Sequence, residues 1–424
     1  MPVATPITIA QTSNINHPPQ RNVIQVGGFI FVFYRRTSDN YLVYISSADG
    51  QTWSSENLAS HSAIASDTDF TVFTDGVSIL IAYPVGTYTT STKGSCTVYT
   101  RKGTQSNGVI TWGTAVSVLS IGGYFKFSIT KTKNYFYFGF VGFYASSNPT
   151  RRVYHVYVYR STDASAWTQI LDSTTMTDSG YQAGIVISKL PKYADGIMLI
   201  TAKYSASSFS YKTYNGSTWS SDLSFGVKTA NAYATGCFSA ITTFTYLGET
   251  LIFAKVPSNS GGSLVFYYYT TSWSSGYTLS SLTCLSPNIF EHHGFIFVAY
   301  IVGTDIYFSE ITYLPSRAIT DYKIIANETS PSNLVTEWLP TPRGTCLLWR
   351  SGTASPYNIR FALLITALEN VLENSFPRAN LGDVIESNDL FSNFSYGLKF
   401  IRVNTLPKKK TKGYSCNDLC DVWY

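Results

Sequence analysis

The sequence predicts an all-β fold, a closed β-propeller of about seven four-stranded blades, and three observations lead to that prediction. A tryptophan follows a short polar turn five times, at Trp53, Trp112, Trp167, Trp219 and Trp273. The intervals between them are 59, 55, 52 and 54 residues, slightly more than the period of a four-stranded blade. Each turn also follows a Tyr-rich apolar run typical of a β-strand. This spacing favours a propeller over a sandwich, whose strands lack such repetition.

The first turn is the most complete, with the sequence Ser-Ala-Asp-Gly-Gln-Thr-Trp at 47–53. A hairpin turn needs a residue that tolerates positive φ, here Gly50, and a short polar side chain, here Asp49, that accepts hydrogen bonds from unpaired backbone donors. An indole buries a large apolar area, so each Trp is expected to anchor its hairpin to a neighbouring blade. The predicted structural residues are Ser47, Asp49, Gly50, Thr52, Trp53, Trp112, Asp163, Trp167, Asn215, Gly216, Trp219 and Trp273.

Apolar runs that begin after a turn residue predict the buried second strand of each blade. They occupy 28–34, 76–83, 134–143, 196–204, 248–256, 294–302 and 344–349. The last run is followed by one more strand-like segment, 358–365, but by no Trp-bearing fourth strand. We therefore expect the N-terminal strand, 6–10, to close the final blade, since closure removes exposed sheet edges. Six blades with an accessory element is the alternative.

The turns resemble the Asp box, or bacterial neuraminidase repeat, of the sialidase-like propellers. That superfamily contains sialidases and many non-enzymatic surface proteins. The resemblance covers roughly residues 1–365, and only the turn at 47–53 matches in full. The resemblance specifies the propeller architecture strongly. It says very little about activity, because proteins with unrelated functions share one fold.

For a catalytic member, the resemblance implies an arginine triad, an Asp acid/base and a Tyr nucleophile activated by a Glu. The matching candidates are Arg21, Arg35 or Arg36, Asp39, Arg343 and Arg350. Adjacent Arg35 and Arg36 would point to opposite faces of a strand. No glutamate occurs from 57 to 248, where the activating Glu is expected, and a tyrosine without one is a poor nucleophile. We predict a non-catalytic protein, with a sialidase-type glycoside hydrolase as the alternative.

Composition indicates a setting outside the cytoplasm. Charged residues make up 13% of the chain, about half the ordinary share. No apolar run reaches the length of about 18 residues that spans a bilayer, and no signal peptide is recognisable. A virion protein leaves the cell with the particle, so we expect an extracellular or virion-surface location. The net charge of +5 comes partly from the cluster at 408–412, which does not favour nucleic acid.

The propeller is assigned to residues 1–366 and a C-terminal extension to 367–424. The extension lacks the blade period, and its apolar residues predict docking to other virion or cell-surface proteins. Cys416 and Cys420 are the disulfide candidate. No cofactor is expected and no metal cluster is recognisable, although Asp67 and Asp69 leave a structural Ca²⁺ as a weak alternative.

The expected function is binding to glycans or to proteins without turnover. Six tyrosines fall in expected inter-strand loops, where exposed phenol rings suit sugar rings and protein partners. They are Tyr88, Tyr124, Tyr144, Tyr181, Tyr233 and Tyr277. A virion attachment or decoration protein that recognises host glycans is the preferred hypothesis. A secreted cell-surface adhesion module is the alternative.

Overall fold

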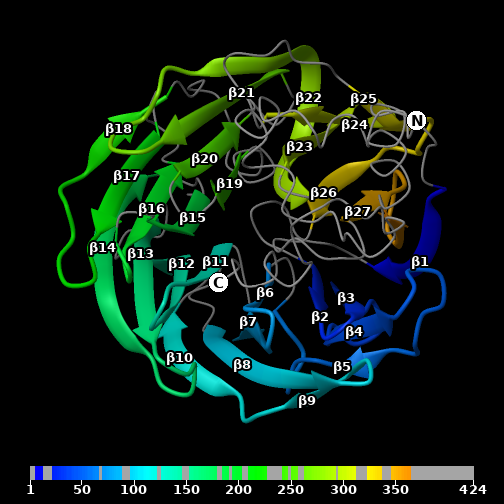
Figure 1. The fold of residues 1–424 in the computed structure, drawn as a ribbon. Coiled ribbons are helices and arrows are strands. Elements are labelled where there is room, and N and C mark those ends of the chain that lie inside the picture. The colour runs from blue at the N-terminus through cyan, green and yellow to red at the C-terminus, as the bar shows by residue number, and fades with distance from the viewer. Residues whose placement is uncertain are drawn as a thin grey trace, which may run out of the picture. The chain divides into compact units, whose positions relative to one another are not determined.

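The computed structural model forms a propeller of antiparallel sheets arranged around a ring (Figure 1). It describes residues 5–12, 22–65, 69–87, 96–121, 126–145, 152–178, 184–190, 193–202, 209–226, 241–246, 250–255, 262–292, 295–311, 322–336 and 345–363. All regular elements in these ranges are β-strands. The all-β class and the propeller are therefore confirmed.

The first three blades follow one another along the chain. Blade 1 comprises β2 (Val23–Val26), β3 (Phe29–Arg35), β4 (Leu42–Ser47) and β5 (Asn57–Leu58). Blade 2 comprises β6 (Thr71–Thr74), β7 (Ser78–Gly86), β8 (Cys96–Ser106), β9 (Val109–Trp112) and β10 (Val116–Ile121), with β9 and β10 both paired to β8. Blade 3 comprises β11 (Lys126–Lys131), β12 (Phe136–Ala145), β13 (Arg152–Ser161) and β14 (Thr168–Asp178).

Three further blades complete the ring. Blade 4 comprises β15 (Gly184–Lys189), β16 (Ile197–Ala202), β17 (Phe209–Tyr214) and β18 (Leu223–Phe225). Blade 5 has seven strands, β19 (Ile241–Tyr246), β20 (Thr250–Lys255), β21 (Gly262–Tyr269), β22 (Tyr277–His292), β23 (Phe295–Val302), β24 (Asp305–Glu310) and β25 (Tyr322–Ile325). Blade 6 comprises β26 (Ser332–Thr336), β27 (Cys346–Ser351), β28 (Tyr357–Leu363) and β1 (Ile7–Thr12).

The strand pairing gives six blades, which is the alternative count, rather than about seven. Each of the seven predicted apolar runs forms a strand. Six of them, β3, β7, β12, β16, β20 and β27, are second strands of a blade, whereas β23 is the fifth strand of blade 5. Two of them share blade 5 because the 16-residue strand β22 pairs with β21 on one side and with β23 on the other. The register of β22 shifts between Leu285 and Asn288. A continuous β22 thus joins what would otherwise be two four-stranded blades.

The core consists of apolar layers between neighbouring sheets. One cluster joins Phe31 and Tyr44 of blade 1 to Val72 and Ile81 of blade 2, and similar clusters follow around the ring. A further cluster lies inside blade 5, between its β21 and β23 halves. The first strands of blades 1 to 5, namely β2, β6, β11, β15 and β19, contact one another in that order and lie toward the centre of the ring, and β26 of blade 6 contacts β22 (Figure 1).

The Asp-box turns form as the sequence predicts. Asp49 Oδ1 accepts hydrogen bonds from the backbone N–H groups of Gln51 and Thr52, both at 2.8 Å. Ser47 Oγ accepts one from Gly50 N at 2.8 Å, and Gly50 has a φ of 75°. Asn215 Oδ1 accepts the equivalent bonds from Ser217 N and Thr218 N, so a neutral amide performs the same task.

Each Asp-box tryptophan contacts the preceding blade. Trp53 packs edge-on against Phe361 of blade 6 at 5.0 Å, and Trp112 lies 6.4 Å from Tyr44 of blade 1. The Trp167 indole donates to Thr100 Oγ1 of blade 2 at 2.8 Å. Trp219 donates to the Ile170 carbonyl of blade 3 at 3.0 Å, and Trp273 stacks on Phe225 of blade 4 at 4.1 Å.

The ring closes through the N-terminal strand, as predicted. Strand β1 pairs antiparallel with β28 as the outermost strand of blade 6. The buried carboxylate of Glu328 accepts two hydrogen bonds from Arg360, at 3.0 and 3.1 Å, and one from Trp349 Nε1 at 3.1 Å. Arg360 also donates to Thr8 Oγ1 of β1 at 3.0 Å. One carboxylate therefore organises the strands that complete the ring.

We expect Asp49 to make part of the stability depend on pH. Hydrogen bonds from the Thr52 and Gln51 N–H groups lower the pKa of Asp49 to about 2, below the ordinary value of 3.8. Its stabilising contribution is therefore present above about pH 4 and is lost as the pH falls toward 2. In urea denaturation, Asp49→Asn should lose this pH dependence but retain the acceptor, whereas Asp49→Ala should lose both. Equal stability of Asp49→Ala and wild type at pH 7 would contradict the assignment.

We expect Glu328→Gln to lower the free energy of unfolding by about 3 kcal/mol, because it leaves the Arg360 guanidinium without its carboxylate partner. Urea denaturation of the full chain measures this change. Asp222→Asn is the control, since Asp222 is 49% exposed and lies 3.6 Å from Lys212. That variant should lose less than about 0.5 kcal/mol. Similar losses in both variants would contradict a role for Glu328 in closure.

Candidate functional site

A pocket of about 620 Å³ lies between blades 1 and 2. It is lined by Arg36, Asp39, Tyr41, Leu58, Ser60, His61, Arg101 and Trp112. The β3–β4 loop, 36–41, supplies three of these residues, and the segment after β5 supplies two more. Strand β4 runs from this loop to the first Asp-box turn, so the loop and the turn lie at opposite ends of the strand. The volume is within the range of pockets that bind small ligands.

The β3–β4 loop is a tight turn that holds its polar side chains in place. Arg36 N donates to the Tyr41 carbonyl at 2.9 Å, and Asn40 N donates to the Arg36 carbonyl at 3.0 Å. Asn40 has a φ of 61°, a conformation that Asn tolerates better than most residues. Asp39 Oδ1 accepts a hydrogen bond from Tyr41 N at 3.2 Å. The loop backbone therefore positions Arg36, Asp39 and Tyr41 together.

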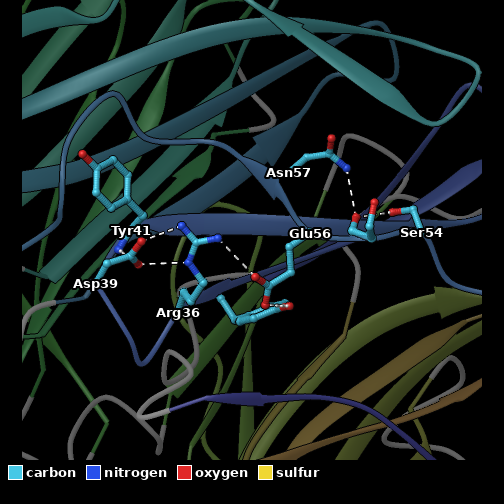
Figure 2. Close-up of polar contacts among 8 residues, drawn as sticks. Arg36, Asp39, Tyr41, Ser54, Glu56 and Asn57 are labelled. Atoms are coloured by element: carbon cyan, nitrogen blue, oxygen red, sulfur yellow. Dashed lines mark hydrogen bonds and ion pairs between the residues drawn. The ribbon is translucent and has the colours of Figure 1, made fainter.

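Arg36 lies between two carboxylates, as Figure 2 shows. It binds Asp39 through Nε and Nη2, at 3.0 and 2.6 Å, and Glu56 through Nη1 at 3.3 Å. These hydrogen bonds, chiefly that from Arg36, hold the pKa of Asp39 below its ordinary value. Asp39 is therefore ionised at neutral pH and is a hydrogen-bond acceptor, not a proton donor.

Glu56 also contacts a tyrosine. The Tyr34 hydroxyl donates to Glu56 Oε1 at 2.7 Å. The Tyr34 side chain is buried, and this burial, reinforced by the Glu56 hydrogen bond and negative charge, raises the pKa of the phenol well above 10. The phenol is therefore protonated at neutral pH. The tyrosine–glutamate contact joins β3 to the residue that precedes β5.

The opposite wall of the pocket is built where the outer edge of blade 2 is interrupted. Strand β8 pairs with β9 and then with β10, and Gly113 between them donates to the Lys102 carbonyl at 2.8 Å. Arg101 Nε donates to the Gly113 carbonyl at 2.8 Å, and its Nη1 donates to the Ala59 carbonyl of blade 1 at 2.9 Å. The guanidinium lies 5.7 Å from the Trp112 ring centroid. Arg101 therefore spans the two blades at the pocket wall.

His61 adds a titratable ring beside Arg101. Its Nδ1 lies 2.8 Å from the Tyr83 hydroxyl, and its ring packs edge-on against Tyr99 at 4.5 Å. Burial, followed by the positive charge of Arg101, lowers the pKa of His61 below 6.5. The imidazole is therefore predominantly neutral at pH 7.

The described arginines of the expected triad occupy different surroundings. Arg36 lines the pocket, whereas Arg35 is a buried residue at the end of β3 that does not line it. Arg350 lies in blade 6, where its guanidinium is 4.1 Å from the Tyr357 ring centroid and its Nε donates to Ser332 Oγ at 2.9 Å. Arg21 and Arg343 lie outside the described residues.

The expected binding tyrosines fall largely outside the described part of the chain. Tyr277 packs within blade 5, stacked on Tyr268 at 5.8 Å. Tyr144 belongs to β12, and its side chain is not among those described. The other four tyrosines, Tyr88, Tyr124, Tyr181 and Tyr233, lie outside the described residues. Asp67 and the disulfide candidates Cys416 and Cys420 lie outside them as well.

The described part of the chain offers no cluster of three or more His, Cys, Asp or Glu residues for a metal ion. Asp69, one of the two residues of the Ca²⁺ hypothesis, is buried and paired with Lys126 of blade 3.

The described residues contain no helix with the length and apolar character of a membrane span.

Sequence reasoning missed Tyr41, His61 and Arg101 as members of one site. The available signal was the insertion in the second Asp-box repeat, between Asn107 and Trp112. Asn107 and Gly108, both at positive φ, form a two-residue hairpin, after which β9 ends at Trp112 and the outer edge breaks. The insertion therefore marks the blade whose altered edge forms the pocket wall.

No protein-family model and no curated protein sequence matches the chain. The fold is similar to that of the BP39L lectin from Burkholderia pseudomallei, with 8% identity, a TM-score of 0.58 and coverage of 81% of this chain and 95% of the lectin. It is also similar to an ulvan lyase of polysaccharide lyase family PL25, with 12% identity, a TM-score of 0.53 and coverage of 83% and 93%.

A sialidase from Trypanosoma rangeli has 12% identity and a TM-score of 0.49, and the match covers 87% of this chain and 59% of the sialidase. Identities this low establish the fold alone. The chain is thus a β-propeller of a type shared by lectins and by glycan-active enzymes.

The His61 environment predicts a measurable titration. In NMR of the folded protein, the His61 ring should titrate below pH 6.5, and Arg101→Gln should raise its pKa because a neighbouring positive charge is removed. Because the folded pKa lies below the unfolded one, His61 stabilises the fold above about pH 6.5, and this contribution is lost as the pH falls through the folded pKa. A His61 pKa unchanged by Arg101→Gln would contradict the proximity of the two groups.

Proposed function

We propose that this propeller binds carbohydrate without cleaving it, and that the pocket between blades 1 and 2 is the binding site. The observation that carries the proposal is the combination of aromatic rings with fixed, charged planar groups in one pocket. Tyr41 and Trp112 offer flat apolar surfaces, and Asp39 and Arg101 offer hydrogen-bond acceptors and donors. A sugar has the matching parts, because its C–H groups form an apolar face and its hydroxyls lie at the edge.

The electrostatics of the pocket support binding over hydrolysis. Glycoside hydrolysis commonly uses two carboxyl groups, one of them protonated to donate to the leaving group. Asp39 is the one carboxylate among the described residues that line the pocket, and Arg36 keeps it ionised. The neighbouring Glu56 is bound to Arg36 and Tyr34. Asp39 therefore does not have the environment of a general acid.

The structural similarities are compatible with this proposal. The BP39L protein is a lectin, and its fold extends over 81% of the chain. The ulvan lyase shows that a similar fold can also carry a polysaccharide-cleaving enzyme. A sialidase-type hydrolase stays the alternative prediction, and it would use Arg21, Arg35 or Arg36, Asp39, Arg343 and Arg350.

Display on a virion or another extracellular surface stays part of the proposal. The low charge content supports such a setting. We assign attachment to neighbouring virion or cell-surface proteins to residues 367–424. Carbohydrate recognition at the pocket would then provide the contact with a host or partner surface.

We expect Tyr41→Ala to weaken glycan binding at least about tenfold, because it removes an aromatic surface of the pocket. Screening the full-length protein on a glycan array, followed by calorimetry with the best oligosaccharide, measures this effect. Tyr193→Ala is the matched control, since Tyr193 is an exposed tyrosine outside the pocket. Equal losses in the two variants would place the binding elsewhere.

Incubation with the bound oligosaccharide tests the absence of turnover. We expect no new reducing ends or released monosaccharide, and no difference between wild type and Asp39→Ala. Sustained sugar release that Asp39→Ala abolishes would contradict the proposal and favour the hydrolase.

A further inference from the structure

We infer that the ligand of this pocket carries an oxyanion, a carboxylate or a sulfate group on the sugar, and that Arg101 receives it. The inference rests on the proposed function and adds the chemical class of the ligand. It follows from three properties of the described residues around the pocket: the distribution of their charges, the unused donors of Arg101 and the rigidity of its guanidinium.

The charges that line the pocket do not cancel. Two guanidinium groups, Arg36 and Arg101, and one carboxylate, Asp39, face it, while His61 is predominantly neutral at pH 7. Asp39 is committed to Arg36 through two hydrogen bonds, and Arg36 is further bound to Glu56. Arg36 is therefore shared by two carboxylates. Among the lining residues that the structure describes, Arg101 is the cation that binds neutral carbonyls instead of carboxylates.

Arg101 has donors left for a ligand. A guanidinium has five N–H groups, and two of those of Arg101 bind the carbonyls of Ala59 and Gly113. Both acceptors are neutral, and no carboxylate of the described residues lies within ion-pair distance of Arg101. This distinguishes Arg101 from Arg36, whose Nε, Nη1 and Nη2 all bind carboxylates. A cation with neutral partners and free donors is suited to an anionic ligand.

The same two hydrogen bonds hold the guanidinium in place before a ligand arrives. Ala59 belongs to blade 1 and Gly113 to blade 2, so both walls of the pocket hold the side chain. The Trp112 ring, 5.7 Å away, adds a cation–π contact. A fixed planar fork binds carboxylate or sulfate oxygens through paired hydrogen bonds and loses less conformational entropy than a lysine would.

A purely structural role would not account for the charge. A side chain with two neutral N–H donors could bridge the carbonyls of Ala59 and Gly113. The guanidinium of Arg101 also places a positive charge beside Trp112, in the pocket that Leu58 lines too. Lys102, the next residue on β8, offers a comparison. It does not line the pocket, and its Nζ donates to the Asp163 carbonyl of blade 3 at 3.1 Å. Two adjacent cations on one strand thus occupy different surroundings.

The test uses matched saccharides and the full-length protein. The probes are oligosaccharides that end in glucose, galactose or mannose, the corresponding hexuronates, and the corresponding hexose 6-sulfates. We expect an anionic member of at least one set to bind at least about tenfold tighter than its neutral parent, and this preference to decline with added NaCl. The uronate and sulfate arms distinguish the two sources of the oxyanion.

Arg101→Gln should reduce the preference for the anionic probe over its neutral parent to less than about threefold. Arg101→Lys, which keeps the charge but loses the fork, should retain an intermediate preference. Lys102→Gln should behave as wild type. Thermal unfolding of each variant verifies that it is folded, and if Arg101→Gln does not fold, Arg101→Lys and the NaCl dependence of wild type decide.

The outcomes separate this inference from the proposed function. Binding of neutral and anionic probes with equal affinity would overturn the inference but leave carbohydrate binding intact, provided that Tyr41→Ala weakens it. An anionic preference that survives in Arg101→Gln would likewise overturn the role of Arg101. Failure of every neutral and anionic probe to bind would contradict both proposals.

Discussion

The contact of each Asp-box indole with the preceding blade is the interaction on which the rest of the structure depends. A four-stranded sheet has two apolar faces, and in a propeller both must be covered by neighbouring sheets. Trp53, Trp167 and Trp219 each reach across such an interface, by packing or by an indole hydrogen bond. The polar turns place these rings, because Asp49, Asp163 and Asn215 hold the backbone in the conformation that delivers the tryptophan.

This division of tasks explains why the turns tolerate variation. An aspartate and an asparagine both supply an oxygen to the same two backbone donors, as Asp49 and Asn215 show. Ala164 occupies the position of Gly50 at a φ of 64°, and the turn still forms, with Ser161 accepting from its N–H group. The requirement is a hydrogen-bond acceptor and a tryptophan, more than a particular sequence.

The candidate site lies where the repeat is interrupted. Blade 2 has a divided outer edge, and the break after Trp112 brings Gly113 to Arg101. Blade 1 contributes the β3–β4 loop, in which Arg36 is bound between Asp39 and Glu56. Regular blades supply rigid, well-packed walls, and the irregular segments between them are free to carry polar groups. The structure therefore separates the residues that hold the ring together from those available to a ligand.

The sequence by itself determined the strand-and-turn content of the fold. It predicted the Asp-box turns, the five tryptophans, the seven apolar strands and the N-terminal strand that closes the ring. These features depend on local chemistry: turn residues that tolerate positive φ, apolar runs of strand length, and a regular interval between tryptophans. Such signals are written within a few consecutive residues and can be read without knowing what lies beside them.

Only the tertiary structure decided the number of sheets and the composition of the pocket. The count of six follows from β22, which pairs on both sides, and pairing is a property of two segments rather than of one. The sequence placed the expected activating glutamate within 57–248, yet Glu56, just before that span, is the residue that contacts Tyr34, whose pKa is raised by burial and by this contact. Arg36 binds two carboxylates and Arg101 binds two neutral carbonyls, a difference set by long-range packing. Contacts between distant residues depend on how the sheets stack, which no local pattern encodes.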